Sequence, residues 1–302
     1  MFSLLAVGSI ALDSVQTPRG RVRDVLGGSA AYFSYAASFF APVRLVGVVG
    51  KDFPREHMDL LASRRIDTRG LQIAEGKTFR WSGRYEGAMN AAETLSVELN
   101  VFGEFDGRVP EEFRDSDLVF LANGHPALQA AVLDQMAAPK FVACDTMNHW
   151  IESARRDVES LLGRVDAAVM NDAEAAMLTG NANLIASGRE ILDMGPEAVI
   201  LKKGEHGSVL LTGQGVWALP AYPVERVLDP TGAGDSFAGG FMGSLAREGR
   251  IDPGSLRRAA AYGTVVSSFN VQGFSLDGLR AAATDAIEAR YREFASMLAL
   301  PV

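Results

Sequence analysis

Cysteine is nearly absent from this chain. Cys144 is the single cysteine in 302 residues, so an internal disulfide framework is excluded and a reducing, cytoplasmic location is expected. The 4 histidines are scattered, and none stands at metal-ligand spacing from another ligand, which argues against a structural zinc site. The sequence also lacks internal repeats, low-complexity tracts and linkers, which favours one compact unit.

Positive charge and long apolar runs are also scarce. The 29 Lys and Arg residues are outnumbered by 37 Asp and Glu residues, so the net charge is −8 and no nucleic-acid partner is expected. The longest stretch without charge, Val25 to Val43, contains glycines, serines, tyrosines and a proline, and it predicts a buried helix rather than a membrane span. The N-terminus has no basic start and no small-residue cleavage site, so it predicts a strand. We therefore expect a soluble protein with no membrane partner.

The remaining composition is that of a globular protein, with 48% hydrophobic and 22% charged residues. Short apolar runs alternate with helical patterns, which predicts an α/β fold with a mainly parallel sheet covered by helices on both faces. The predicted strands are Leu4–Val7, Arg44–Val49, Leu118–Leu121, Phe141–Cys144, Ala167–Met170 and Val199–Lys202. The predicted helices are Ala30–Phe40, Glu56–Ser63, Leu128–Met136, Ile151–Leu162, Asp172–Leu178, Asp235–Arg247, Ser255–Phe269 and Asp277–Ser296.

Two segments interrupt this alternation. Ser14–Leu26 carries turn residues between short alternating stretches, and Lys77–Phe102 contains two alternating runs, Phe79–Tyr85 and Thr94–Phe102, joined by a polar turn. Together they predict a small β-unit that stands off the main sheet and serves as a lid. The alternatives are a hairpin without function and an edge used for oligomerisation.

The stretch from Asp229 to Phe241 carries the clearest chemistry. Pro230 and the glycines predict a tight turn, after which a helix begins near Gly234. Unpaired backbone N–H groups at such a helix start form an anion site. Asp235 would repel a bound phosphate, but it is well placed to take a proton from an attacking hydroxyl. The stretch therefore predicts phosphoryl transfer to an alcohol; the alternative is a capping Asp on a tightly packed helix.

Two common phosphate-binding motifs are missing. No Walker A loop occurs, and Phe237 stands where a dinucleotide fingerprint needs a third glycine. Instead, Asp229-Pro-Thr-Gly-Ala-Gly-Asp235 resembles the C-terminal signature of the ribokinase-like (PfkB) family of carbohydrate kinases, which includes adenosine kinase, fructokinase and ketodeoxygluconate kinase. Further motifs in the expected order extend the resemblance over nearly the whole chain.

The resemblance implies both a fold and an activity. The fold is a three-layer αβα sandwich with a mainly parallel central sheet and a small β-sheet lid. It forms a single domain over residues 1–302, with lid segments at about 14–26 and 77–102. The activity is ATP-dependent transfer of the γ-phosphoryl group to a hydroxyl, typically that of a CH₂OH group, on a sugar or sugar-derived small molecule.

The resemblance also implies the residues that bind the acceptor. Asp13, taken to lie at a strand end, matches a carboxylate that accepts hydrogen bonds from acceptor hydroxyls. Gly27 and Gly28 match a di-glycine that places backbone against the sugar. Tyr32 stands where the family usually has an Asn that binds a sugar hydroxyl, and its side chain is free to donate its hydroxyl, stack on a ring or pack.

The same resemblance assigns the catalytic and magnesium-binding residues. Asp235 is the base, and the N–H groups of Gly232, Ala233 and Gly234 steady the transferring phosphoryl group. Asn171 and Glu174 match an N-x-x-E element that helps to hold Mg²⁺ and phosphate largely through water, with Glu174 as the indirect ligand. The alternative for this pair is a helix N-terminus capped by Asn171.

Further matches concern the nucleotide and a second cation. Lys202, Gly204 and Gly207 lie in a turn that lines ATP in the family, and its alternative is a surface hairpin turn with solvated lysines. Asp229 and Thr231 match positions near a monovalent-cation site, such as one for K⁺, in some members. The family's D-x-N-x-R stretch is replaced by residues 145–150, which lack the Arg.

Three questions stay open at the level of sequence. The acceptor is a sugar or, alternatively, a nucleoside, which Tyr32 and the lid aromatics Phe79 and Trp81 mildly favour. A non-catalytic sugar or nucleotide sensor is a further alternative, against which the intact Asp235 argues. The exposed edges of the lid sheet favour a homodimer.

Overall fold

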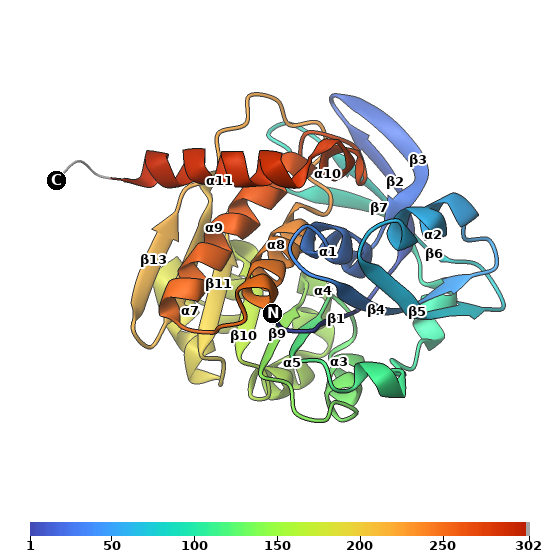
Figure 1. Cartoon of the computed structure of the whole chain (residues 1–302), viewed down its shortest axis with the longest axis horizontal. Helices are drawn as coiled ribbons and strands as arrows, with labels where there is room; N and C mark the ends of the chain where they lie inside the picture. The colour runs from blue at the N-terminus through green and yellow to red at the C-terminus, as the bar shows by residue number, and fades with distance from the viewer. Residues whose placement is uncertain (300–302) are drawn as a thin grey trace.

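A large, mainly parallel sheet forms the centre of the molecule (Figure 1). The structure is a computed structural model that describes residues 1–299, and within them the sheet has nine strands in the order β13-β12-β11-β10-β9-β8-β1-β4-β5. The strands from β11 to β5 run parallel, while β12 is antiparallel to both β11 and β13. The strands are β1 Leu4–Val7, β4 Val43–Gly50, β5 Ile66–Ala74, β8 Leu118–Leu121, β9 Phe141–Asp145, β10 Ala167–Asn171, β11 Ala198–Lys202, β12 Ser208–Thr212 and β13 Gly215–Leu219.

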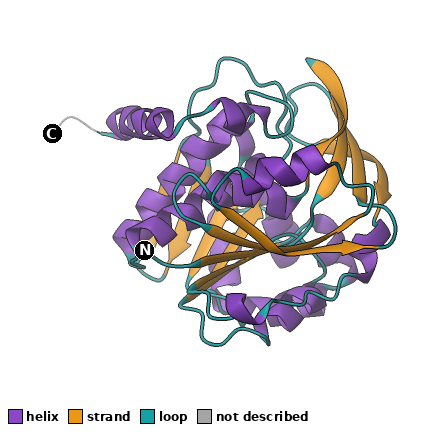
Figure 2. Cartoon of the chain, turned by 45° about the vertical axis from the view of Figure 1, so that its right-hand side comes forward, coloured by secondary structure: helices purple, strands orange, loops and turns teal. Residues whose placement is uncertain are grey.

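Helices cover both faces of this sheet and give three layers (Figure 2). One face carries α1 Ser29–Ala37, α2 Arg55–Ala62, α8 Ala233–Glu248, α9 Pro253–Asn270, α10 Asp277–Ala281 and α11 Thr284–Leu298. The other carries α3 Pro126–Leu133, α4 Asn148–Ser153, α5 Arg155–Leu162, α6 Asp172–Thr179 and α7 Leu184–Asp193. Short 3₁₀ turns lie at η1 Asn100–Glu104, η2 Glu111–Phe113 and η3 Gly204–His206.

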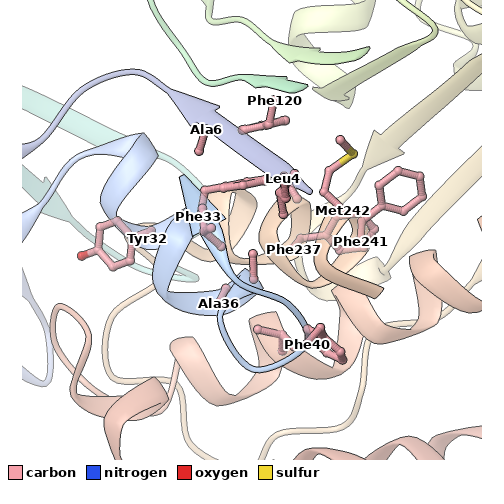
Figure 3. Packing of buried hydrophobic residues seen from close by; sticks show 14 of the residues in the cluster. Leu4, Ala6, Tyr32, Phe33, Ala36, Phe40, Phe120, Phe237, Phe241 and Met242 are labelled. Carbon is pink, nitrogen blue, oxygen red and sulfur yellow. The ribbon is translucent and has the colours of Figure 1, made fainter. Parts of the chain in front are cut away.

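The strands are apolar on both sides because each face is buried under helices. In β1, Leu4 packs in the core beneath α1 and α8, while its neighbour Leu5 packs in the core on the opposite face. In the first core, the rings of Phe33 and Phe120 stack at 4.1 Å between centroids (Figure 3). Gly239 of α8 faces the carbonyl of Phe33, where a Cβ atom would lie only 2.4 Å away, so α8 packs directly on α1.

The small β-unit expected from the sequence is a separate four-stranded sheet in the order β3-β2-β6-β7. It stands at one end of the main sheet (Figure 2). Its strands are β2 Ala11–Thr17, β3 Gly20–Gly27, β6 Phe79–Tyr85 and β7 Ala92–Glu98. The segment predicted as the strand Thr94–Phe102 is extended only to Glu98 and then turns into η1.

Other predictions need correction. Asp13 lies inside β2 of the small sheet, not at the end of a main-sheet strand. The predicted helix Ile151–Leu162 is broken at Ala154 between α4 and α5, and the predicted helix Asp277–Ser296 is broken after Ala281. Strands β5, β12 and β13 were not predicted: partly exposed residues interrupt the apolar patterns of β5 and β13, whereas β12 is buried from Ser208 to Leu211 but has an apolar run of only three residues.

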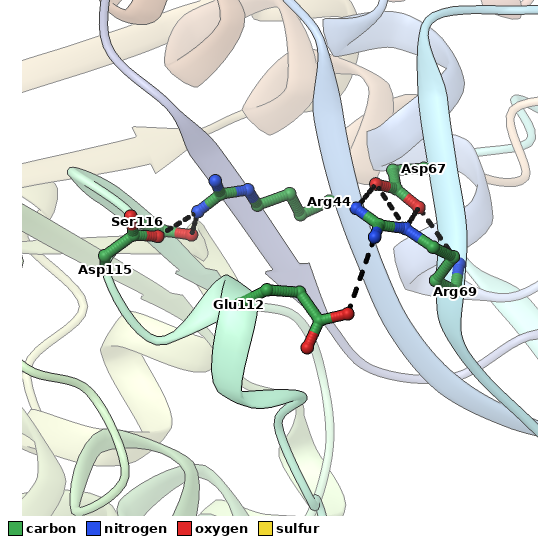
Figure 4. A network of polar contacts seen from close by, with 6 residues as sticks. All are labelled: Arg44, Asp67, Arg69, Glu112, Asp115 and Ser116. Carbon is green, nitrogen blue, oxygen red and sulfur yellow. Dashed lines mark hydrogen bonds and ion pairs between the residues drawn. The ribbon is translucent and has the colours of Figure 1, made fainter.

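An exposed polar network lies at the amino-terminal ends of the parallel strands (Figure 4). Arg44, near the start of β4, donates to Ser116 at 2.9 Å, and Arg69 of β5 pairs with Asp67 at 2.6 Å. Exposed pairs of this kind contribute at most about 1 kcal/mol each. The candidate functional residues lie at the other, carboxyl edge of the sheet. No helix within residues 1–299 has the length and apolar character needed to cross a bilayer.

Candidate active site

Three neighbouring parallel strands end in polar residues. Asp145, Asn171 and Lys202 are the last residues of β9, β10 and β11, and Asn171 lies opposite Lys202 in the strand register. Parallel strands place such residues along one edge of the sheet, which is the usual position of ligand sites in open α/β folds. The turn that precedes α8 lies at the same edge, because Lys202 touches it.

Two buried polar contacts hold this turn. Asp229 accepts a hydrogen bond from the N–H of Thr231 at 2.9 Å, and the amide of Asn270 donates to the carbonyl of Thr231 at 2.8 Å. Gly232 then adopts a left-handed conformation with φ 72°, and α8 begins at the next residue. The turn is therefore shaped from behind and leaves its outer side to a ligand.

The N–H groups of the turn are not equivalent. Within the described part of the chain, those of Gly232 and Gly234 have no hydrogen-bond partner, as an anion site requires. The N–H of Ala233, expected to contact the phosphoryl group, instead donates to the carbonyl of Pro230 at 3.1 Å. In this structure the turn itself uses this donor, so Gly232 and Gly234 are the residues of the expected trio whose N–H groups are unpaired.

Asp235 lies in the first turn of α8 and is partly exposed. Loss of hydration raises the pKa of its carboxyl, and the Asp145 carboxylate raises it further, while Lys202 opposes both effects. The pKa of Glu174 is raised for the same reasons. A carboxyl with a raised pKa is a stronger base once ionised, which suits proton abstraction from an alcohol.

Lys202 points inward from the end of β11. Its Nζ lies 3.3 Å from an oxygen of Asp145, and the two side chains are 17% and 7% exposed. Burial alone would lower the pKa of Lys202, yet Asp145, Glu174 and Asp235 raise it above its ordinary value, so the ammonium stays charged. The solvated-lysine alternative is thus wrong for Lys202.

The other parts of that turn are those of a hairpin. Residues 203–207 join β11 to the antiparallel strand β12, as the hairpin alternative predicted. Gly204 and Gly207 both have positive φ, and a Cβ atom on Gly207 would lie 2.0 Å from the carbonyl of Leu219. Lys203 is partly exposed.

Asn171 and Glu174 form a complete capping box at the start of α6. The side chain of Asn171 accepts the N–H of Glu174 at 2.8 Å, and Glu174 accepts the N–H of Asn171 at 2.7 Å. The capping alternative is therefore confirmed. It leaves the second oxygen of Glu174 for a water-mediated contact. No group of three or more His, Cys, Asp or Glu side chains among residues 1–299 is arranged to hold a metal ion. A Mg²⁺ ion held largely by water and phosphate oxygens fits such a donor set.

The residues expected to bind the acceptor lie in the small sheet and where it joins α1. Asp13 is buried, and a Cβ atom on Gly27 would lie 1.9 Å from its carboxylate, so only glycine leaves room there. Gly28 has φ 93° and packs against the backbone of Ser9 and Ile10. Burial, with smaller contributions from Asp229 and Asp235, raises the pKa of Asp13 to about 8.

Tyr32 supports the turn before α8 from the same side. A Cβ atom on Gly232 would lie 2.4 Å from its ring, so the ring packs directly on this glycine. The side chain is 1% exposed, and its hydroxyl has no hydrogen-bond partner among the described residues. In Figure 3 this hydroxyl points away from the other labelled side chains. Of the three roles left open for Tyr32, packing is the one that the structure shows.

The small sheet touches the site at two points. The hydroxyl of Tyr85, the last residue of β6, lies 3.3 Å from that of Thr231 in the catalytic turn. Asn90, in the β6–β7 connection, donates to Glu205 of the hairpin turn at 3.4 Å. The small sheet is therefore closed over the Asp13 side, while Gly232–Asp235 remain partly exposed.

Sequence reasoning missed three residues that shape the site. Asp145 was noted only as the start of a stretch that departs from the family pattern, although its position at the end of a buried apolar strand was an available signal. Tyr85 and Asn270 reach the turn from residues far away in the chain, and no local pattern marks them.

The fold and the site together define a phosphotransferase that acts on an alcohol group. Residues 1–278 match the pfkB family carbohydrate kinases. The chain therefore belongs to this family, and the expected ribokinase-like fold and kinase activity are confirmed.

Individual proteins that resemble this chain are also named as kinases. The chain is 32% identical to a cytidine kinase of Thermococcus kodakarensis over 82% of this chain and 90% of that protein. Its structure resembles that of the Burkholderia thailandensis nucleoside kinase in complex with inosine, with a TM-score of 0.80, 20% identity and coverage of 96% and 98% of the two chains. It also resembles ribokinase from Thermotoga maritima, with a TM-score of 0.77, 18% identity and coverage of 97% and 100%.

The raised pKa of Asp13 predicts a pH effect on stability. The folded chain holds this proton up to about pH 8, whereas the carboxyl ordinarily titrates near 3.8. Ligand-free protein should therefore lose stability as pH rises between these values. Asp13→Asn cannot ionise at this position. We expect its free energy of unfolding, relative to that of wild type, to be at least about 1 kcal/mol higher at pH 8.5 than at pH 5, since one pKa unit corresponds to about 1.4 kcal/mol.

Urea unfolding followed by circular dichroism at both pH values measures this difference. Other carboxyls with raised pKa values affect both proteins alike, so the comparison isolates Asp13. Asp285→Asn, on the exposed start of α11, is the control and should follow wild type. An equal stability difference at the two pH values would show that Asp13 is ionised throughout.

Proposed function

We propose that this kinase is a nucleoside kinase that transfers the γ-phosphoryl group of ATP to the 5′-CH₂OH of a ribonucleoside, with cytidine as the first candidate. The observation that carries this proposal is the 32% identity to a cytidine kinase across 82% of the chain. The likeness to a nucleoside kinase that binds inosine supports the fold that such an acceptor needs. A free sugar as acceptor, the first expectation from the sequence, becomes the second candidate.

The proposed reaction uses the first turn of α8. Asp235 accepts the proton of the acceptor hydroxyl, whose oxygen attacks the γ-phosphorus as the bond to the β–γ bridging oxygen breaks and ADP leaves. The N–H groups of Gly232 and Gly234, together with the dipole of α8, stabilise charge on the transferring group. Most of the rate enhancement then comes from positioning and electrostatics.

The acceptor would lie beneath the small sheet. Asp13 would form hydrogen bonds with the hydroxyl groups of the acceptor, and Gly27 and Gly28 would let the surrounding backbone approach the acceptor closely. Tyr32 supplies the wall on the side of Gly232, and its unpartnered hydroxyl is available to the acceptor. The buried position of these groups means that the small sheet must open before the acceptor can enter.

ATP would bind on the partly exposed side of the turn. Residues 202–207, including Gly204 and Gly207, line the nucleotide, and Glu174 holds Mg²⁺ through water. The ion offsets phosphate charge when it is bound. A monovalent cation such as K⁺ would bind beside Asp229 and Thr231, because one buried oxygen of Asp229 has no partner among the described residues. ATP as substrate and the buried Cys144 both fit the cytoplasmic location expected from the sequence.

The small sheet would act as the lid. Its contacts reach the catalytic turn through Tyr85 and the hairpin turn through Asn90, so one closing movement covers both substrates and excludes water. The sensor alternative is disfavoured, because a sensor has no need of Asp235 beside an anion site.

The lid would also form a homodimer interface. β7 is the edge strand of its sheet, and every residue of the strand is exposed. Leu95 and Val97 are 51% and 52% exposed, and an unpaired edge with apolar side chains favours pairing with a second copy of the chain.

An acceptor panel tests the proposed activity. ADP release from Mg-ATP is measured with cytidine, uridine, inosine, ribose, ribose 1-phosphate and fructose. We expect cytidine or another nucleoside to give the highest kcat/KM, and Asp235→Asn to lower kcat by about 10²–10⁴-fold through loss of the general base.

Asp172→Asn is the matched control, because Asp172 is an exposed carboxylate in the first turn of α6. It should retain the wild-type rate. Turnover of sugars without turnover of nucleosides would reject the proposed acceptor, and undiminished activity of Asp235→Asn would reject the catalytic assignment.

Removal of the contact between Tyr85 and Thr231 should weaken closure of the small sheet over the site. Tyr85→Phe loses the hydroxyl that meets Thr231, and a neutral hydrogen bond is worth about 0.5–1.5 kcal/mol. We expect acceptor KM to rise by about 2–10-fold and the ratio of ADP formed to product formed to exceed one, because water enters the site. Tyr222→Phe, which loses a hydroxyl contact with Glu293 outside the site, should leave both quantities unchanged. Equal values for the two variants would mean that the Tyr85 contact does not hold the lid.

Light scattering tests the dimer. Wild-type protein at micromolar concentration should have twice the mass of one chain, and Val97→Glu should reduce it to that of a monomer. Ile73→Glu, at an exposed apolar residue of β5 outside the lid sheet, should remain dimeric. A monomeric wild type would dismiss the lid interface.

A further inference from the structure

Negative charge surrounds the place where ATP would deliver its phosphates. Asp145 ends β9, Glu174 lies in the first turn of α6, and Asp235 lies in the first turn of α8. Lys202 lies 3.3 Å from Asp145 and rests against Gly234, the neighbour of Asp235, and the charges of Asp145 and Asp235 both raise the pKa of Glu174. A triphosphate brought beside them is repelled unless cations offset this charge, and a cation of the protein can do so together with Mg²⁺.

Lys202 is placed to be that cation. Its Nζ would lie 2.9 Å from a Cβ atom on Gly234, so the ammonium rests against the first turn of α8 where glycine leaves the backbone open. The same ammonium is 3.3 Å from Asp145. It therefore lies between the end of the sheet and the unpaired backbone N–H groups of Gly232 and Gly234.

In the ion pair of Lys202 and Asp145, the carboxylate is held in place and the lysine side chain is free to adjust. The backbone N–H of Thr146 donates to the Asp145 carboxylate at 2.7 Å, and Gln129 donates to the backbone carbonyl of Asp145 at 3.0 Å, so both the carboxylate and the backbone that carries it are held. The lysine side chain is long and flexible, it is 17% exposed, and its ammonium has three donors. A phosphate oxygen can engage the remaining donors while Asp145 holds the ammonium in place.

We propose that Lys202 is a catalytic residue that binds the transferring phosphoryl group, and that Asp145 is the positioning residue that aims it. As the γ-phosphorus passes from the bridging oxygen of ADP to the acceptor oxygen, the ammonium donates hydrogen bonds to the non-bridging oxygens and remains protonated throughout. This inference rests on the proposed use of ATP by the site but on no particular acceptor.

The test separates kcat from KM. Lys202→Met should lower kcat by at least about 100-fold and change the KM of ATP by less than about 5-fold, because the ammonium acts on the group in transit. Affinity for MgADP with aluminium fluoride, a mimic of that group, should fall by a similar factor, while affinity for MgADP alone changes by less than about 5-fold. Lys140→Met is the matched control, since Lys140 also pairs with an aspartate, Asp117, but lies at the opposite end of β9 from Asp145. It should match wild type in kcat and in aluminium fluoride binding.

A second variant guards against a folding defect. Removing Lys202 alone leaves Asp145 buried without its partner, which destabilises proteins. The double variant Lys202→Met/Asp145→Asn removes both charges, so it should recover the wild-type melting temperature yet remain at least about 100-fold slow. Recovery of kcat in the double variant would overturn the proposal and leave the pair a structural role.

The experiments distinguish failure of the proposed nucleoside acceptor from failure of the proposed role of Lys202. All variants are assayed with whichever acceptor of the panel wild type turns over, so rejection of nucleosides leaves the Lys202 comparison intact. Equal aluminium fluoride affinity in wild type and Lys202→Met would overturn the Lys202 proposal even if cytidine is the acceptor.

Discussion

The turn before α8 keeps two backbone N–H groups unpaired at the edge of a buried sheet, and the site depends on how this is made stable. Unpaired donors are costly unless a ligand or water satisfies them. The turn cannot use those donors to hold its own shape, so its shape comes from behind. Asp229 fixes Thr231, Asn270 fixes the same residue from α9, and Tyr32 fills the space against Gly232. The contacts of Asn270 and Tyr32 come from α9 and α1, which are far from the turn in the chain, so the shape of the turn depends on the complete fold.

Charge is the second constraint on this edge. The carboxyls of Asp13 and Asp229 are buried here and that of Asp235 is partly exposed, and loss of hydration raises the pKa of each. Lys202 pairs with a further carboxylate, Asp145, and its own side chain is 17% exposed. Without bound substrates such an arrangement costs stability. Its retention is understandable if Mg²⁺, phosphate and acceptor hydroxyls complete the charge balance, as expected of a site built for phosphoryl transfer.

The sequence was sufficient for most of the fold because the central strands are short, apolar and regularly spaced. It was also sufficient to locate Asp235 and its turn, since glycines and proline constrain the backbone locally. It failed where long-range contacts decide. The break at Ala154 separates two helices that one apolar pattern joined, and Asp13 belongs to the lid sheet only because β2 pairs with β6, far away in the chain. The contact of Tyr85 with Thr231 joins residues 146 positions apart, and no local sequence pattern predicts it.

Tyr32 and Gly232 show why positions in this site must be considered in pairs. An aromatic ring fits at position 32 because Gly232 has no side chain and takes φ 72°, a conformation that the turn needs in any case. The ring therefore touches the turn before α8, while burial and the charges of Asp13, Asp229 and Asp235 raise the pKa of its hydroxyl. A change of this side chain would alter the support of the turn and the surroundings of the acceptor together. Departure from the family pattern at this residue is thus tied to the shape of the turn before α8, and under the proposed mechanism acceptor choice and phosphoryl transfer would share this one structural element.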